Sequence, residues 1–264
     1  MNNVPIFTAD GLHDLVDIED AAERSPVILH APHGGNTIPE SCLPPFTISR
    51  AELAKEHRLL TDHGTDGMAR LTGGTSRIAP RLSRLVVDVE RFEGDAEEMN
   101  EVGMGVLYAR GTHGRPIRTL DAEEREPLLA WFRSYGERFA DLVDQTLEHH
   151  GRAVIIDIHS YQAEPLPYEL HQEDGRPELC IGVDERHTPP TLVDAVREAF
   201  DGWSIEVNQP FRGSYMPLRH LGDPRIFSVM LEIRRDRYLD AHGVADDAAV
   251  QEIARRIGRV VAGV

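Results

Sequence analysis

The sequence predicts an α/β protein whose sheet is mixed and mostly parallel, with helices on its flanks. Apolar runs of strand length, bounded by turn residues, alternate along the chain with amphipathic stretches of helix length. Several of these runs are almost continuous in valine, isoleucine and leucine, which is typical of strands covered on both faces. No internal repeat or long linker divides the 264 residues, so we expect one domain over residues 1–264.

Six strands and four helices follow from this pattern. The strands are expected at residues 27–31, 84–89, 153–158, 179–183, 204–207 and 227–233. The helices are expected at residues 49–71, 121–149, 190–200 and 244–261. The polar, acidic segment 92–118 fits neither pattern, and its length and five glycines indicate an insertion near the strand ends, either functional or merely tolerated.

Composition narrows the classes of function. Lysine and arginine total 28 against 45 aspartates and glutamates, and a net charge of −17 disfavours binding to nucleic acid or to anionic membranes. No apolar run approaches the roughly 18 residues of a membrane helix, and the first residues lack the features of an export signal, so we expect a cytoplasmic protein. Cys42 and Cys180 have no metal-binding spacing, and we expect both to be buried thiols.

Two histidines end the first predicted strand. His30 and His33 precede Gly34 and Gly35, and the carboxyl ends of strands hold the ligand site in parallel α/β sheets. The glycines let a ligand approach the backbone closely. A turn with an incidental surface histidine is the alternative for this motif taken alone.

A second pair of polar residues ends the strand predicted at 153–158. Alternation along a strand sends Asp157 and His159 to the same face, which suits a metal ligand with an orienting or basic neighbour. Asp62 or Asp66 would complete a set of two histidines and one carboxylate, which leaves a fourth zinc position for water. On a continuous helix these two aspartates share a face, and capping of the helix is the other interpretation of Asp62.

Glu232 interrupts an apolar strand and is a candidate general base and acid. An ionised carboxylate in a core strand is costly unless it is paired or used, and pairing with Arg234, Arg235 or another arginine is the structural alternative. Arg84, Arg91 and Arg212 are candidate anchors for an anionic substrate, because a guanidinium matches a carboxylate. Each of them would serve equally as an ion-pair partner within the fold.

The sequence lacks the motifs of several other enzyme classes. The sequence has no Gly-x-x-x-x-Gly-Lys-Ser/Thr loop and no Gly-x-Gly-x-x-Gly after a strand, so it does not support nucleotide binding through those loops. It has no Gly-x-Ser-x-Gly motif either, which disfavours a serine hydrolase.

With these residues in view, the chain resembles the N-formylglutamate amidohydrolase family from about residue 30 to residue 238. The motifs that carry the resemblance are His33-Gly34-Gly35, Asp62-x-Gly64-Thr65, residues 83–91, Asp157-Ile158-His159-Ser160, Asn208-x-Pro210-Phe211-x-Gly213 and Glu232-Ile233-Arg234. The resemblance implies a zinc-exopeptidase-like (phosphorylase/hydrolase-like) fold, related at a distance to zinc carboxypeptidases. It also implies hydrolysis of an N-formyl or related N-acyl amino acid, such as N-formylglutamate, to formate and the amino acid, as in histidine degradation.

The resemblance also assigns roles to single residues. It makes His33, Asp62 and His159 the ligands of zinc, or of cobalt or manganese, and it makes Glu232 the general base and acid. It makes Arg91 the anchor of a small anionic substrate. The further candidates for substrate binding are Arg84, Asn208, Arg212 and Tyr215.

One departure from the family pattern keeps other functions open. Many members have Asn-Arg where this chain has Glu90-Arg91, and a glutamate there would alter the recognition of a substrate carboxylate. A metal-free binding module for amino-acid derivatives is therefore a second hypothesis. A metal-dependent peptidase or cell-wall amidase is a third, and the lack of an export signal counts against its cell-wall form.

Overall fold

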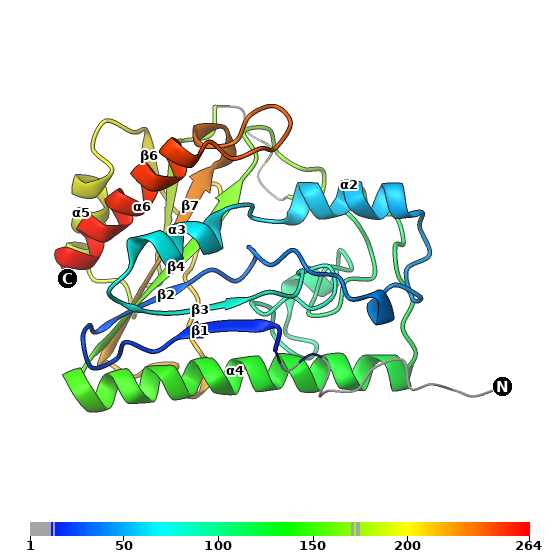
Figure 1. Ribbon diagram of the computed structural model, residues 1–264, viewed down its shortest axis with the longest axis horizontal. Coiled ribbons are helices and arrows are strands. Elements are labelled where there is room, and N and C mark those ends of the chain that lie inside the picture. The colour runs from blue at the N-terminus through cyan, green and yellow to red at the C-terminus, as the bar shows by residue number, and fades with distance from the viewer. Residues whose placement is uncertain (1–11, 13, 170–171, 173–174) are drawn as a thin grey trace.

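A seven-stranded sheet forms the centre of the computed structural model, which describes residues 12, 14–169, 172 and 175–264 (Figure 1). The strands are β1 (Val16–Glu19), β2 (Val27–His30), β3 (Ser76–Pro80), β4 (Ala153–Tyr161), β5 (Leu179–Gly182), β6 (Ile205–Val207) and β7 (Ile226–Arg234). Their order is β1-β3-β2-β4-β7-β5-β6. Neighbours run parallel except β1 with β3 and β5 with β7, so the mixed, mostly parallel sheet predicted from the sequence is confirmed. That the chain is one domain stays a prediction.

Helices cover both faces of this sheet. They are α2 (Arg50–Leu60), α3 (Thr65–Thr72), α4 (Ala122–His150), α5 (Pro190–Ala199) and α6 (Asp247–Ala262), with short 3-10 turns at Glu40–Cys42, Glu98–Asn100, Leu218–His220 and Arg235–Arg237. Helix α4 runs along one face, and α3, α5 and α6 lie on the other (Figure 1).

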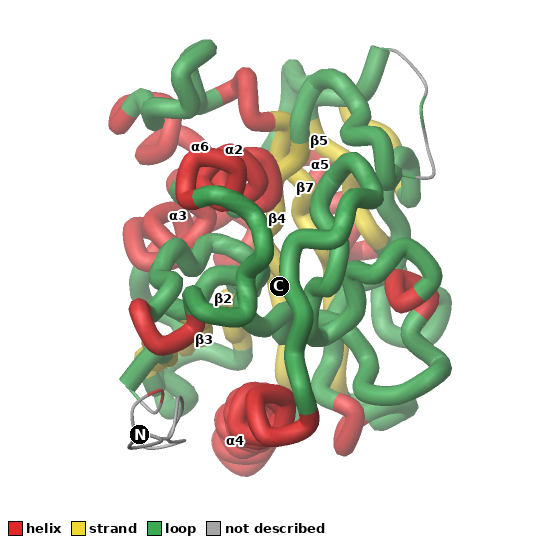
Figure 2. Tube along the Cα trace, turned by 90° about the vertical axis from the view of Figure 1, so that its right-hand side faces the viewer, coloured by secondary structure: helices red, strands yellow, loops and turns green. Residues whose placement is uncertain are grey.

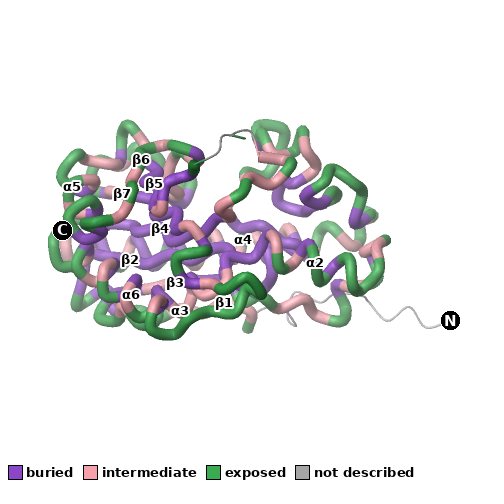
Figure 3. The backbone as a smooth tube through the Cα atoms, turned by 90° about the horizontal axis from the view of Figure 1, so that it is seen from above, coloured by how far each residue is buried: buried purple, intermediate pink, exposed green. Residues whose placement is uncertain are grey.

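The side chains of the central strands alternate between two hydrophobic cores. In β2, Val27 and Leu29 pack with α3, α5 and α6, whereas Ile28 packs with α4. The alternation leaves β2 and β4 buried on both faces, as the purple tube of Figure 3 shows. Strands of this kind are the near-continuous apolar runs of the sequence.

The prediction of a single helix over residues 49–71 is wrong, because the chain forms two helices there. Helix α2 ends at Leu60, Thr61 is extended, and Gly64 adopts a left-handed conformation with φ 86°. The N–H of Asp62 donates to the carbonyl of His33 at 2.9 Å instead of continuing the helix. The other three predicted helices are confirmed with ends shifted by up to three residues.

The strand predicted over residues 84–89 is also wrong, since this segment is a buried turn. The N–H groups of Val86 and Val87 both donate to the carbonyl of Ser83. The valines are apolar because the segment is buried against α4, which is a property that a turn and a strand share. Strands β1 and β3 were not predicted, because β1 is a half-exposed edge strand and both are rich in polar residues.

The polar segment 92–118 packs against helix α2 through a few apolar side chains. Met104, Tyr108 and Ile117 form a third apolar cluster with Leu53 and Leu60 of α2. Loops, including this one, dominate the right-hand side of Figure 1, which faces the viewer in Figure 2.

Two smaller expectations concern the cysteines and membrane insertion. Cys42 and Cys180 are buried free thiols, as predicted. Among the described residues, no helix is both long enough and apolar enough to cross a membrane.

Candidate active site

Polar side chains from three adjacent strands meet on the α4 side of the sheet, near the strands' carboxyl ends. His30 is the last residue of β2, and His33 follows three residues later. His159 of β4 and Glu232 of β7 are register partners, so their side chains stand next to each other on the same face. The structure thus brings together predicted site residues that are up to about two hundred positions apart in the sequence.

Three donor atoms lie at mutual distances that suit one metal ion. His33 Nδ1 is 3.2 Å from His159 Nδ1. Asp62 Oδ2 is 3.4 Å from His159 Nδ1 and 3.8 Å from His33 Nδ1. Tetrahedral zinc with ligand bonds of about 2.0–2.1 Å places its ligand atoms about 3.4 Å apart. All three side chains are buried, so these atoms face one another with little competition from solvent.

Asp62 is held in this position by its second oxygen and by the backbone. Arg235 Nη2 donates to Asp62 Oδ1 at 2.8 Å, and the N–H of Ser160 donates to Oδ2 at 3.1 Å. Burial alone would raise the pKa of Asp62, but His159 and Arg235 outweigh it and hold the pKa well below its usual value. Asp66, the sequence alternative, lies on α3 and pairs with Arg70 away from the histidines.

Asp88 orients the ring of His33. Its Oδ1 is 2.9 Å from His33 Nε2, while its Oδ2 accepts from Arg84 Nη2 at 2.8 Å and from the Tyr108 hydroxyl at 2.6 Å. Burial lowers the pKa of His33 to about 4, so the ring is neutral. A neutral ring that donates from Nε2 to Asp88 has its lone pair on Nδ1, the atom that faces Asp62. Asp88 was not predicted as a site residue, although it lies in the motif 83–91 that carries the family resemblance.

Glu90 occupies the centre of the site. The sequence placed it beside the proposed anchor Arg91 but did not predict its contacts with the two histidines. Its Oε2 is 3.1 Å from His159 Nε2 and 3.7 Å from His33 Nε2, so it is a rival to Asp62 as the third ligand of a metal. Burial and the neighbouring Asp157 raise the pKa of Glu90 to about 8. Against this arrangement, His33 Nε2 is already engaged by Asp88 at the shorter distance of 2.9 Å.

Glu232 is buried and one of its oxygens is free for chemistry. Oε2 has no hydrogen-bond partner among the described residues. Burial raises the pKa of Glu232 to about 8, although His159 acts in the opposite direction. The alternative of pairing with Arg234 or Arg235 is wrong, because these arginines pair with Asp236 and Asp62 instead.

The candidates for substrate binding differ in what they already contact. Arg91 has a fifth of its side chain exposed, lies 3.5 Å from Asp88 Oδ2 through Nε, and makes no hydrogen bond through that atom to the described residues. Arg84 is buried and engaged with Asp88 and Tyr108. Arg91 therefore has the freer guanidinium of the two.

The remaining candidates lie in the segment after β6. The side-chain oxygen of Asn208 accepts from the N–H of Val183 at 2.8 Å, so it is committed to the backbone. Tyr215 packs its ring 5.2 Å from that of His30, and Arg212 is exposed. Their roles in substrate binding stay predictions.

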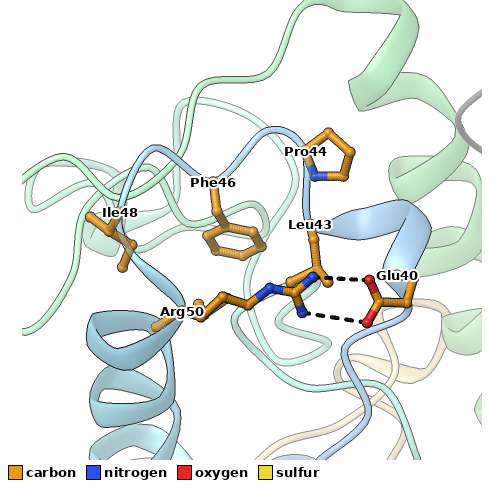
Figure 4. A pocket seen from close by; sticks show the side chains of 7 residues that line it. Glu40, Leu43, Pro44, Phe46, Ile48 and Arg50 are labelled. Atoms are coloured by element: carbon orange, nitrogen blue, oxygen red, sulfur yellow. Dashed lines mark hydrogen bonds and ion pairs between the residues drawn. The ribbon is translucent and has the colours of Figure 1, made fainter.

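A separate pocket of about 370 Å³ lies at the start of α2 (Figure 4). Arg50 and Glu40 form an ion pair at its rim. The lining residues are Glu40, Leu43, Pro44, Phe46, Ile48, Arg50 and Leu53, none of which belongs to the site described above.

A comparison with models of known protein families shows which family the chain belongs to. The family model described as N-formylglutamate amidohydrolase matches residues 25–239, which contain strands β2 to β7 and every residue of the candidate site. The chain belongs to the N-formylglutamate amidohydrolase family. It is therefore a hydrolase of amide C–N bonds, as the sequence motifs predicted.

Two solved structures are similar to this amidohydrolase over almost all of its length. One is an N-formylglutamate amidohydrolase from Ralstonia eutropha JMP134, with a TM-score of 0.78 and 19% identity over 94% of this chain and 97% of that one. The other is a gene product of Agrobacterium tumefaciens, with a TM-score of 0.71 and 21% identity over 97% of this chain and 96% of that one. At these identities the likeness shows a shared fold. Among curated protein sequences, no relative of the chain is found.

Proposed function

We propose that this amidohydrolase is metal-dependent and cleaves a small anionic N-acyl amino acid, such as N-formylglutamate, to formate and the free amino acid. The observation that supports this most directly is the spacing of His33 Nδ1, His159 Nδ1 and Asp62 Oδ2, at 3.2 to 3.8 Å from one another. Two imidazoles and one carboxylate are the donor set of hydrolytic zinc sites. A cytoplasmic location and a place in histidine degradation stay predictions.

His33, Asp62 and His159 would hold the metal through these atoms. Zinc at such a site supplies a Lewis acid that polarises a carbonyl and lowers the pKa of water towards about 7. Asp88 keeps His33 in the tautomer that leaves Nδ1 free, and Arg235 keeps one oxygen of Asp62 turned towards the histidines. Both supporting contacts are buried, so the donor atoms are preorganised.

Glu232 acts as the general base and then as the general acid. Its free Oε2 takes a proton from the attacking water as the new C–O bond forms at the carbonyl carbon. The same oxygen then returns the proton to the amide nitrogen, so that the C–N bond breaks with a neutral amine as the leaving group. The raised pKa of the carboxyl suits both steps, because a group with a pKa near working pH gives and takes protons readily.

Arg91 would bind the carboxylate of the substrate. Its guanidinium is the less committed of the two arginines beside Asp88, and a planar fork binds a carboxylate through two parallel hydrogen bonds. The identity of the acyl amino acid depends on this contact and on Glu90 beside it.

The test combines metal analysis with turnover. The full chain is purified without chelator and assayed for zinc by elemental analysis. It is then screened against N-formyl, N-acetyl and N-carbamoyl amino acids with zinc, cobalt and manganese. We expect bound zinc and formate release from N-formyl amino acids, and His33→Ala should lose turnover together with the zinc ion that His33 would hold. Bound zinc and turnover that both survive in His33→Ala would refute the proposal, and ligand-induced thermal shifts without metal or turnover would favour a binding module.

A further inference from the structure

A second group of metal-ligating side chains lies directly behind the proposed zinc ligands. It consists of His30, Glu90 and Asp157, whose donor atoms all lie within 4.8 Å of one another. His30 Nδ1 is 3.0 Å from Asp157 Oδ1 and 3.8 Å from Glu90 Oε1. His30 and Asp157 are register partners on β2 and β4, so the sheet itself sets this juxtaposition.

The donor atoms of this group lack hydrogen-bond partners. His30 Nδ1, Glu90 Oε1 and both oxygens of Asp157 make no hydrogen bond to any residue that the structure describes. His30 is completely buried and Asp157 is 1% exposed, while Glu90 keeps 11% of its side chain exposed. These atoms lie 3.0 to 3.8 Å from one another or from His159, but without hydrogen-bond geometry. Buried polar atoms in this state are costly, and several that face one place fit a bound ligand.

The ring of His30 is fixed with Nδ1 facing the two carboxylates. Its Nε2 is 2.9 Å from the hydroxyl of Tyr135, and the rings of Phe139 and Tyr215 pack on it at 4.6 and 5.2 Å. A hydrogen bond on one ring nitrogen that leaves the other free is the usual support of a metal-ligating histidine.

The charges in this part of the site are not balanced by arginine. Arg84 and Arg91 lie against Asp88, and Arg235 pairs with Asp62. Within the described residues, the ion-pair contacts of Glu90 and Asp157 are with histidines alone. Two buried carboxylates that face only histidines would be stabilised by a divalent cation, because buried charges are expensive unless they are paired.

We propose that His30, Glu90 and Asp157 bind a second divalent cation of the first transition series, distinct from the ion held by His33, Asp62 and His159. One imidazole nitrogen and two carboxylate oxygens suit zinc or manganese. The observed separations of 3.0 and 3.8 Å bracket the roughly 3.4 Å between ligand atoms of a tetrahedral zinc ion. The inference rests on the proposed function in one respect. The ion proposed at His33, Asp62 and His159 has to be counted apart from the ion at the second site.

The experiment counts metal ions in the full chain. The protein is stripped with chelator, reloaded with excess zinc or manganese, freed of unbound metal and analysed for metal per chain. We expect two ions in the wild type, one in His30→Ala and one in His33→Ala. His187→Gln is the matched control, because His187 is a buried histidine whose ring nitrogens bond to the backbone at Ile226 and Gly222. This control should keep both ions.

A second variant guards against misfolding. Glu90→Gln keeps the size of the side chain and removes the charge, and it should also bind one ion while its thermal unfolding stays cooperative. A single ion in the wild type that disappears in His33→Ala and persists in His30→Ala would overturn the second site and leave the proposed function intact. Two ions and full turnover in His33→Ala, with one ion in His30→Ala, would refute the proposed function and support the second site.

Discussion

Asp88 and His33 are joined through the side of the imidazole that faces away from Asp62. The Oδ1–Nε2 distance is 2.9 Å, and the opposite nitrogen of His33 points at Asp62 and His159. One carboxylate thus determines the tautomer of a proposed ligand without touching the metal position. The proposed ligands and the residues that orient them are different side chains, so separate substitutions can test the two roles.

Asp88→Asn should weaken metal binding without removing a ligand. An amide carries no charge to strengthen the basicity of His33, and loss of such a support typically lowers metal affinity roughly 10–100-fold. Competition with a chromophoric chelator measures this change. Tyr108→Phe removes only one of the hydrogen bonds to Asp88 and should have a smaller effect, so an equal loss in both variants would argue against orientation by charge.

Asp62→Asn and Asp66→Asn should differ in kind. The first removes a proposed ligand and should lose the ion at His33, Asp62 and His159 together with turnover. The second removes an exposed pair with Arg70 on α3 and should cost about 0.3–1 kcal/mol of unfolding free energy with full activity. Elemental analysis and urea unfolding read the two effects. Unchanged metal content and turnover in Asp62→Asn, with loss of turnover in Glu90→Gln, would transfer the ligand role to Glu90.

Arg91→Lys should discriminate between substrates. Lysine keeps the charge and loses the two-pronged contact, and a lost hydrogen bond to a charged group costs about 1.5–3 kcal/mol, which is roughly 10- to 150-fold in kcat/KM. N-formyl amino acids with a free carboxylate should show this loss, and their amides should not. Equal losses on both substrates would mean that Arg91 supports the fold through Asp88.

Gly64 and Gly67 should respond oppositely to alanine. Gly64 has φ 86°, and a side chain in the left-handed region costs about 1–2 kcal/mol. Gly67 lies inside α3 with open space around it, so alanine there should stabilise the protein by about 0.5–1 kcal/mol. Chemical unfolding of both variants measures the difference, and a stabilised Gly64→Ala would contradict the required backbone conformation.

The two thiols should be unreactive in the native protein. Burial disfavours the thiolate and raises the pKa of Cys42 to about 11 and that of Cys180 to about 12. At pH 8, only roughly one Cys42 in a thousand would be ionised. A disulfide reagent should therefore titrate two thiols after unfolding and almost none before. The unfolded chain loses these protons first, so stability should fall as pH rises above about 9.

The strands were predictable from the sequence where their side chains are apolar, and the errors occur at the polar strands β1 and β3 and at the apolar turn 84–89. Strands β2, β4 and β7 are covered on both faces, and burial gave them an unmistakable apolar pattern. Edge strand β1 pairs through its backbone and leaves its side chains half exposed, so its sequence carries no comparable signal.

The site was predicted only in part for a related reason. His33, Asp62 and His159 belong to motifs that the sequence displays, and the structure brings them together. Asp88, Glu90 and Arg235 act through contacts with residues that are distant in the sequence, and a single chain gives no sign of those contacts. Segment 84–89 concealed Asp88 further, since its buried valines are typical of a strand interior.

The hydroxyl of Tyr108 ties the long acidic segment to the carboxylate that orients His33. Any attempt to transplant this loop between family members would consequently carry catalytic geometry with it. A graft would have to include both Tyr108 and Asp88. Shortening the segment so that Tyr108 is lost would remove a hydrogen bond from Asp88 and so loosen the orientation of the His33 ring.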